Sequence, residues 1–237
     1  MSPTANMNDD GPGGINAEGA NVDTIGNLIY DIGELGNRLT HGIYYSSGTG
    51  RITNNVVGNI SGYGIHLWHY AHHVMIINNT IFNSGWGGDG GGIIIGAGDH
   101  DDAYVTGCVV ANNISVNNPG NGIAEFGDIP SQVGDNTFVN NLLWGNDNDW
   151  QLTKGKPTRT IIGDPKFVDF QPDGTGDYQL LSGSSAIDKA LAEYTTVDVQ
   201  GKRRNGLPDI GAFEYGGTEA TKGSCNKPGL GVSFHQF

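Results

Sequence analysis

Aromatic and imidazole side chains recur at matching positions in a set of short sequence repeats. Each repeat opens with a Gly-Ile pair, at residues 42–43, 64–65, 92–93 and 122–123. If these segments are strands, side chains alternate between two faces, so the isoleucines point inward and the next residues point outward. The outward positions then form two columns: Tyr44, His66, Ile94 and Ala124, and, two residues further on, Ser46, Trp68, Gly96 and Phe126.

Flat aromatic rings aligned along one surface suit one kind of ligand. A soluble protein seldom exposes a strip of Tyr, Trp and Phe without a partner, and such rings pack well on the C–H faces of pyranose sugars. The alternative is that loops fold over the strip and bury it. The candidate sugar-contacting residues are Tyr44, His66, Trp68, His69, Trp86, Glu125 and Phe126.

Glu125 differs from the other candidates because alternation places it on the inward side of its strand. Either the strand ends before this residue, or its carboxylate lies in an interior of low dielectric constant. In the second case, burial favours the neutral form of the carboxyl group and raises its pKa, as is common at functional sites. Both interpretations are open from the sequence.

Two further clusters could bind a metal ion. Asp99, Asp101 and Asp102 offer the hard oxygen ligands that Ca²⁺ prefers, although Asp and Gly also form solvated turns for local reasons. His69 and His73 would flank a metal on a helix, but this segment has a strand-and-loop pattern, which favours sugar hydrogen bonding or loop packing over zinc. We therefore expect no required cofactor, with Ca²⁺ as the metal to consider.

A second repeat predicts the scaffold. Its copies begin at Asn27, Asn55, Asn79, Asn113 and Asn141, at intervals of 28, 24, 34 and 28 residues. Short β-branched runs between Asn and Gly turns do not form helices of useful length, and one coil cannot bury its apolar side alone. The repeats predict an all-β fold, a right-handed parallel β-helix of about six coils. Asn suits the corners because it tolerates left-handed backbone geometry and its amide can bond to the next coil.

Changes in periodicity divide the chain into four predicted segments. Residues 1–21 are expected to form an N-terminal segment or cap, and residues 22–158 the coils. Residues 159–215 are expected to form the last coil and a C-terminal cap, because a solenoid needs a cover over its exposed final coil. Residues 216–237 have no pattern and are expected to be a tail.

The repeat pattern x-Ile-x-Asn-Asn-x-Ile-x-Asn … Gly-Ile resembles the pectate-lyase-like β-helix proteins of secreted polysaccharide-active systems. Residues 164–215, which include Asp164-Pro165 and Asp177-Tyr178, resemble the C-terminal end of many secreted bacterial β-helix proteins. The resemblance implies an extracellular location, although no signal peptide is visible at the first residues. It does not select an activity, because this fold hosts lyases, hydrolases, epimerases and binding modules.

The charge distribution argues against several partners. The chain has 12 Lys+Arg against 25 Asp+Glu, a formal net charge of −13, and before Lys154 its only cations are Arg38 and Arg51. A uronate lyase needs a basic side chain and cations that neutralise the substrate carboxylate, so this chain would make a poor one. Phosphate would be repelled, and no apolar run approaches the ~20 residues that span a bilayer. We expect neither nucleic acid nor membrane as a partner.

Other catalytic and redox chemistry has little support in the sequence. Inverting glycosidases of this fold use clustered Asp residues, and of the family's signatures only Asp101-Asp102 is present. Glu125 with Asp99 or Asp89 is a conceivable acid pair. No signature of a Ser or Cys triad occurs. Two cysteines are too few for a disulfide framework, and Cys108 is expected to be a small core residue.

The interpretation that fits best is a non-catalytic carbohydrate-binding module for a neutral plant polysaccharide, xylan or a related β-glycan. The chain looks similar in architecture to the β-helical xylan-binding modules of family 89. That resemblance implies a catalytic glycosidase domain as a partner in the full-length protein. The alternatives are a polysaccharide lyase or glycoside hydrolase of the β-helix class, with or without Ca²⁺ dependence, and a purely structural or adhesive repeat.

Overall fold

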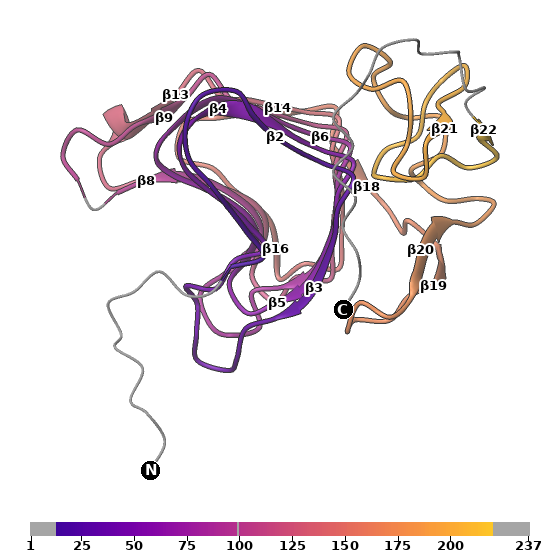
Figure 1. Cartoon of the computed structure of the whole chain (residues 1–237), viewed down its shortest axis with the longest axis horizontal. Coiled ribbons are helices and arrows are strands. Elements are labelled where there is room, and N and C mark those ends of the chain that lie inside the picture. Colours follow the sequence, from indigo (N-terminus) through magenta and orange to yellow (C-terminus); the bar gives the residue numbers. More distant parts are fainter. Residues whose placement is uncertain (1–12, 99, 220–237) are drawn as a thin grey trace, which may run out of the picture.

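A computed structural model of the chain describes residues 13–98 and 100–219. The chain winds into a parallel β-solenoid in which three columns of strands are stacked along one axis (Figure 1). Six strands lie in the third column, joined by about five turns. This confirms the predicted parallel β-helix; its right-handed sense stays a prediction. Among the described residues there is no helix long and apolar enough to cross a bilayer.

The three columns have the following members. Column one holds β1 (Ile15–Ala17), the first parts of β4 (Ile43–Thr53) and β6 (Tyr63–Ile77), β8 (Gly91–Ala97), β12 (Asn121–Gly127) and β16 (Asn148–Gln151). Column two holds β2 (Val22–Ile25), the second parts of β4 and β6, β10 (Val109–Ala111), β14 (Thr137–Val139) and β17 (Pro157–Thr158). Column three holds β3 (Leu28–Ile32), β5 (Val56–Ile60), β7 (Thr80–Ser84), β11 (Ile114–Val116), β15 (Leu142–Trp144) and β18 (Ile161–Ile162).

A few short elements lie outside these columns. β9 (Val105–Thr106) pairs in parallel with β13 (Val133–Gly134), which follows the 3₁₀ turn η1 (Pro130–Gln132). Two antiparallel pairs lie in the C-terminal part, β19 (Phe167–Asp169) with β20 (Asp177–Leu180), and β21 (Lys202–Arg203) with β22 (Thr218–Glu219).

The core is a stack of aliphatic side chains inside the coils. Ile43, Ile65, Ile93 and Ile123 are in register with one another and are fully buried, as the Gly-Ile repeat predicts. Cys108 is also buried, and burial raises the pKa of its thiol to about 12. Each such isoleucine contributes about 1.5–3 kcal/mol on burial, so the coils are stabilised by their neighbours.

The paired asparagines at one corner have two distinct roles. The first of each pair, for example Asn78 (φ 53°), has left-handed backbone geometry and turns the chain. The second is fully buried and bonds to the adjacent coils: the backbone N–H and Nδ2 of Asn55 both donate to Asn79 Oδ1 at 2.9 Å, and Asn79 Nδ2 donates to the carbonyl oxygen of Ile52. The predicted role of Asn at the corners is confirmed.

The N-terminal boundary differs from the predicted one. β1 pairs in register with residues 43–45 of β4, so the first coil begins at Ile15 and not at residue 22. The sequence did not reveal this strand because it has only three residues and lacks the Gly-Ile pair.

The C-terminal segment also lies elsewhere than predicted. Residues 164–215 lie beside the solenoid, along the outer face of column three, and not as a cover stacked on the final coil (Figure 1). Tyr178 packs on Phe82 with ring centroids 4.2 Å apart, and the corner amides of Asn54, Asn78, Asn112 and Asn140 donate to carbonyl oxygens of this segment. The physical reason is that column three presents an apolar outer face that needs cover. The predicted tail, residues 216–237, contains β22, and its residues beyond 219 lie outside the described part of the chain.

Candidate functional site: an aromatic groove across the coils

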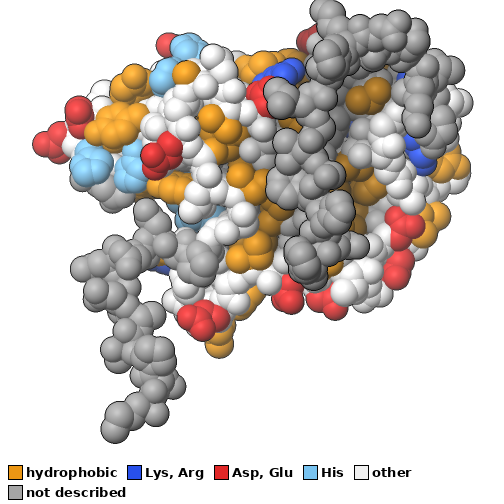
Figure 2. All heavy atoms as spheres, in the orientation of Figure 1, with side chains coloured by type: hydrophobic (Ala, Val, Ile, Leu, Met, Phe, Trp, Pro, Cys, Tyr) orange, Lys and Arg blue, Asp and Glu red, His pale blue; other side chains and the backbone are white. Residues whose placement is uncertain are grey.

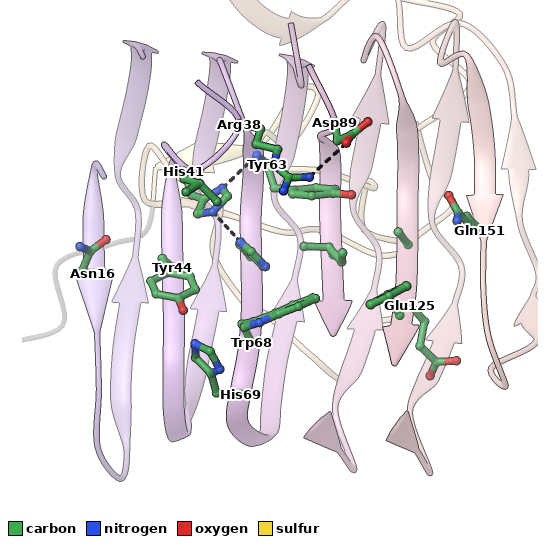
Figure 3. Close-up of a pocket in the computed structure, with 15 residues that line it drawn as sticks. Asn16, Arg38, His41, Tyr44, Tyr63, Trp68, His69, Asp89, Glu125 and Gln151 are labelled. Atoms are coloured by element: carbon green, nitrogen blue, oxygen red, sulfur yellow. Dashed lines mark hydrogen bonds and ion pairs between the residues drawn. The ribbon is translucent and has the colours of Figure 1, made fainter. Parts of the chain in front are cut away.

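A groove of about 310 Å³ crosses the outer face of column one (Figure 3). It receives residues from the first coil to the last, and with a strand spacing of about 4.8 Å five steps along the axis correspond to roughly 24 Å. Its walls are formed by Asn16, Arg38, Leu39, His41, Tyr44, Tyr63, His66, Trp68, His69, Asp89, Ile94, Ala124, Glu125, Phe126 and Gln151. Figure 2 shows histidine side chains gathered on the side of the molecule where the β8–β9 connection lies.

The first predicted outward column forms the floor of this groove. Tyr44 lies opposite His66 in register, and Ile94 lies opposite both His66 and Ala124. All four residues line the groove. The alternation argument therefore placed this column correctly.

The second column forms an aromatic platform. The rings of Trp68 and Phe126 are stacked with an interplanar angle of 6° and centroids 5.9 Å apart, although Gly96 of β8 lies between their coils. A Cβ atom at Gly96 would overlap the six-membered ring of Trp68. Glycine at this position therefore allows the indole to lie across β8 and reach Phe126, a residue that is 39% exposed.

His69 belongs to the groove for a local backbone reason. Its φ of 54° is left-handed, and the pairing of β4 with β6 shifts register between Tyr45 and Ser47. This irregularity aims His69 into the groove, where its Nδ1 is buried without a hydrogen-bond partner among the described residues. A strand bulge is a common means of re-aiming one side chain.

His41 is a groove residue that the sequence reasoning missed. It is buried, its Nδ1 accepts from the Tyr63 backbone N–H at 3.1 Å, and its Nε2 lies 2.7 Å from His66 Nδ1. Burial lowers the pKa of His41 to about 4, and it lowers the pKa of His66 well below its ordinary value. The signal was present, because His41 and Tyr63 each precede a Gly-Ile pair.

The carboxylate of Glu125 is buried and accepts hydrogen bonds from groups inside the protein. β12 continues through this residue, so of the two interpretations the buried carboxylate is the one found, at 2% exposure. One carboxylate oxygen accepts from the backbone N–H groups of Lys154 and Gly155, both at 2.7 Å, and the other accepts from Asn136 Nδ2 at 3.0 Å. Three donors satisfy this group, so it stabilises the following coil and is not available to a ligand.

Trp86 lies apart from the groove. It is in the turn after β7 and is partly buried, and it is not one of the residues that form the walls. Its Nε1 is buried and has no acceptor among the described residues. Sequence alone does not distinguish this tryptophan from Trp68, because loop geometry decides where its side chain points.

The predicted metal clusters are not assembled by the described residues. No group of three or more His, Cys, Asp or Glu side chains there is arranged to hold a metal ion. Asp99 lies outside the described residues, Asp101 and Asp102 are exposed, and Tyr70 Oη donates to Asp102 at 2.9 Å. The Ca²⁺ site therefore stays a prediction. His73 lines a separate depression with Asp23 and Arg51.

Charged groups at the groove are already paired. Arg38 Nη1 lies 3.1 Å from Asp89 Oδ2 at the rim, with side chains 63% and 88% exposed (Figure 3). Among the described residues, Asp89 and Glu125 are the carboxylates that line the groove, and each has its own partners. The arrangement suits hydrogen bonding and ring stacking better than acid–base chemistry.

Two comparisons with known proteins do not assign the chain to a family. No protein-family model matches the chain, and a comparison with curated proteins finds no matching protein.

Proposed function

We propose that this chain is a non-catalytic carbohydrate-binding module for a neutral polysaccharide, xylan or a related β-glycan. The observation that carries the proposal is the pair of nearly parallel rings of Trp68 and Phe126 along the groove. Stacked, partly exposed rings offer a flat apolar face to a pyranose ring, and neighbouring polar groups can accept or donate hydrogen bonds to its hydroxyls. Tyr44, His66 and His69 are the remaining groove residues that we assign to the ligand.

The direction of the groove favours a linear polymer. Residues from the first coil, such as Asn16, and from the last, such as Gln151, line the same groove. A ligand that lies along the solenoid axis contacts several coils in succession, whereas a single monosaccharide would contact only one or two. The free energies of several weak stacking and hydrogen-bond contacts then sum to a measurable binding affinity.

The electrostatics favour an uncharged ligand. Burial lowers the pKa of both His41 and His66, so these rings are neutral near pH 7. The cation of the groove, Arg38, is paired with Asp89, and the chain carries a net charge of −13. A polyuronate would be repelled by this net negative charge.

The same paired groups argue against catalysis. A glycosidase needs two carboxyl groups that flank the scissile bond. The carboxylate of Glu125 already accepts hydrogen bonds from three internal donors. A lyase needs a base with access to the substrate, and the basic side chain that lines the groove, Arg38, lies at its rim beside Asp89. We propose that the module acts outside the cell, beside a catalytic glycosidase domain of the same protein.

Affinity electrophoresis tests this proposal. The protein is run through gels that contain xylan, mixed-linkage β-glucan or polygalacturonate, and we expect retardation by a neutral glycan with no release of reducing or unsaturated ends. Trp68→Ala should abolish the retardation. Trp144→Ala is the matched control, because Trp144 is 44% exposed on column three, outside the groove. Equal retardation of both variants, or product release by the wild type, would contradict the proposal.

A further inference from the structure

Two imidazole rings connect the backbone to the floor of the groove. The Tyr63 backbone N–H donates to His41 Nδ1, and His41 Nε2 lies 2.7 Å from His66 Nδ1. The fourth nitrogen, His66 Nε2, is buried and has no hydrogen-bond partner among the described residues. Buried N–H groups are rarely left without an acceptor, so this atom requires an explanation.

The Tyr63 amide determines which nitrogen of each ring carries the proton. A backbone N–H can only donate, so His41 Nδ1 must present its lone pair. Neutral His41 then carries its proton on Nε2 and donates it to His66 Nδ1. Neutral His66 must in turn carry its proton on Nε2. Both rings are neutral near pH 7 because burial lowers their pKa values.

We propose that His66 Nε2–H is a preset hydrogen-bond donor that recognises an uncharged oxygen acceptor of the ligand. Resting on the proposed function, this acceptor is a hydroxyl, ring or glycosidic oxygen of the sugar chain. The rings of Tyr44, Tyr63 and Trp68 surround His66, with centroids 5.2, 5.4 and 5.1 Å from it. A side-chain rotation among these rings, which is common on binding, admits the oxygen to the buried N–H.

The fixed tautomer also defines what this site rejects. A general base or a metal ligand needs a lone pair on His66 Nε2. Moving the proton to His66 Nδ1 would force His41 to carry its own proton on Nδ1, where it would face the Tyr63 N–H donor. The histidine pair therefore selects acceptor oxygens and discriminates against metal ions and ammonium groups.

Nitrogen-15 NMR of the histidine side chains tests the tautomers without any ligand. At pH 7 we expect both His41 and His66 to be protonated on Nε2 and unprotonated on Nδ1. A His66 proton on Nδ1, or signals averaged over both tautomers, would overturn the proposal. On titration with xylohexaose, the His66 Nε2–H resonance should shift.

Two substitutions separate hydrogen bonding from packing. His66→Phe removes the donor and should weaken xylohexaose binding about tenfold, which corresponds to about 1.4 kcal/mol. His66→Gln keeps an N–H donor of similar reach and should retain more of the affinity, while thermal melting checks that both variants fold. Xylohexaose binding that leaves the His66 resonances unchanged would overturn this inference and leave the proposed function intact. A wild type that neither xylan nor β-glucan retards would overturn the proposed function, and this inference with it.

Discussion

Two faces of the solenoid carry aromatic and apolar side chains, and the two faces differ in how far other parts of the chain bury these side chains. On column three, Phe82 is fully buried because Tyr178 of the C-terminal segment packs on it. On column one, Trp68 and Phe126 form a comparable stack, yet Phe126 remains 39% exposed. Within the described residues the C-terminal segment covers the part of column three around Phe82, although Trp144 of the same column is 44% exposed, and Phe126 stays partly exposed at the groove. We take this difference to separate a structural face from the proposed binding face.

The ion pairs on the two faces should give the largest contrast in stability. Arg204 and Glu214 within the C-terminal segment have side chains only 2% and 3% exposed, and Arg204 also donates to Asn54 of the second coil. Removing one partner of a buried pair leaves an uncompensated charge, so Arg204→Leu should lower the free energy of unfolding by about 3–5 kcal/mol.

Arg38→Leu is the matched control for that substitution. The pair of Arg38 with Asp89 is mostly exposed, and exposed pairs contribute less than about 1 kcal/mol. Urea denaturation of both variants measures the contrast. Equal losses would mean that the C-terminal segment does not depend on its buried pair.

Substitutions of aromatic residues on the two faces should have opposite effects, one on stability and the other on glycan binding. Phe82→Ala removes a fully buried ring and should cost about 3–5 kcal/mol of unfolding free energy, with glycan affinity retained in the folded fraction. Trp68→Ala should do the reverse, with lost retardation on neutral glycan gels and a smaller change in stability. A Phe82 variant that loses affinity while folded would show that the two faces are coupled.

Gly96→Ala tests the geometry of the platform directly. Gly96 has an ordinary backbone conformation, so alanine introduces no strain in φ, but its Cβ would overlap the Trp68 ring. We expect a loss of about 1–3 kcal/mol in stability from overpacking and weaker glycan binding. Gly134→Ala is the control, since the atom nearest to its added Cβ is Lys154 Nζ at 3.8 Å. Unchanged binding by Gly96→Ala would place the ligand elsewhere.

Acidification from pH 7 to 5.5 should cause the smallest of these changes in stability. Burial lowers the pKa of His41 to about 4, so the stability that this neutral ring contributes is present above the unfolded pKa of ~6.5 and is lost as the pH falls through 4. At pH 5.5 the loss should already be roughly 1 kcal/mol. Thermal melting of the wild type and of His41→Gln from pH 7 to 4 measures it, and identical pH dependence would contradict the assignment.

The coils could be predicted from sequence because their signals are local and repeated. The inward isoleucines, such as Ile65, and the corner asparagines, such as Asn79, recur at positions where one residue type does one physical task in every coil. Register then follows, since a shift by one residue would place the whole apolar set outside. The outward position of Trp68 came from the same alternation.

The rest depends on contacts between distant segments, which the repeat does not encode. The C-terminal segment was expected over the last coil because capping is a general need, but the apolar outer face that it covers is visible only once column three is assembled. Loop geometry places Trp86 outside the groove. Glu125 lines the groove, but internal donors hold its carboxylate. His41 was missed because it lies before the strand.

The most direct test of the central claim is an NMR measurement of contacts between xylohexaose and the four tryptophans. The protein is labelled in its indole rings, and nuclear Overhauser effects from sugar C–H protons are recorded. We expect them on Trp68, with Trp86, Trp144 and Trp150 as internal controls. Bound xylohexaose with no effect at Trp68, or with effects at Trp144 instead, would contradict the account.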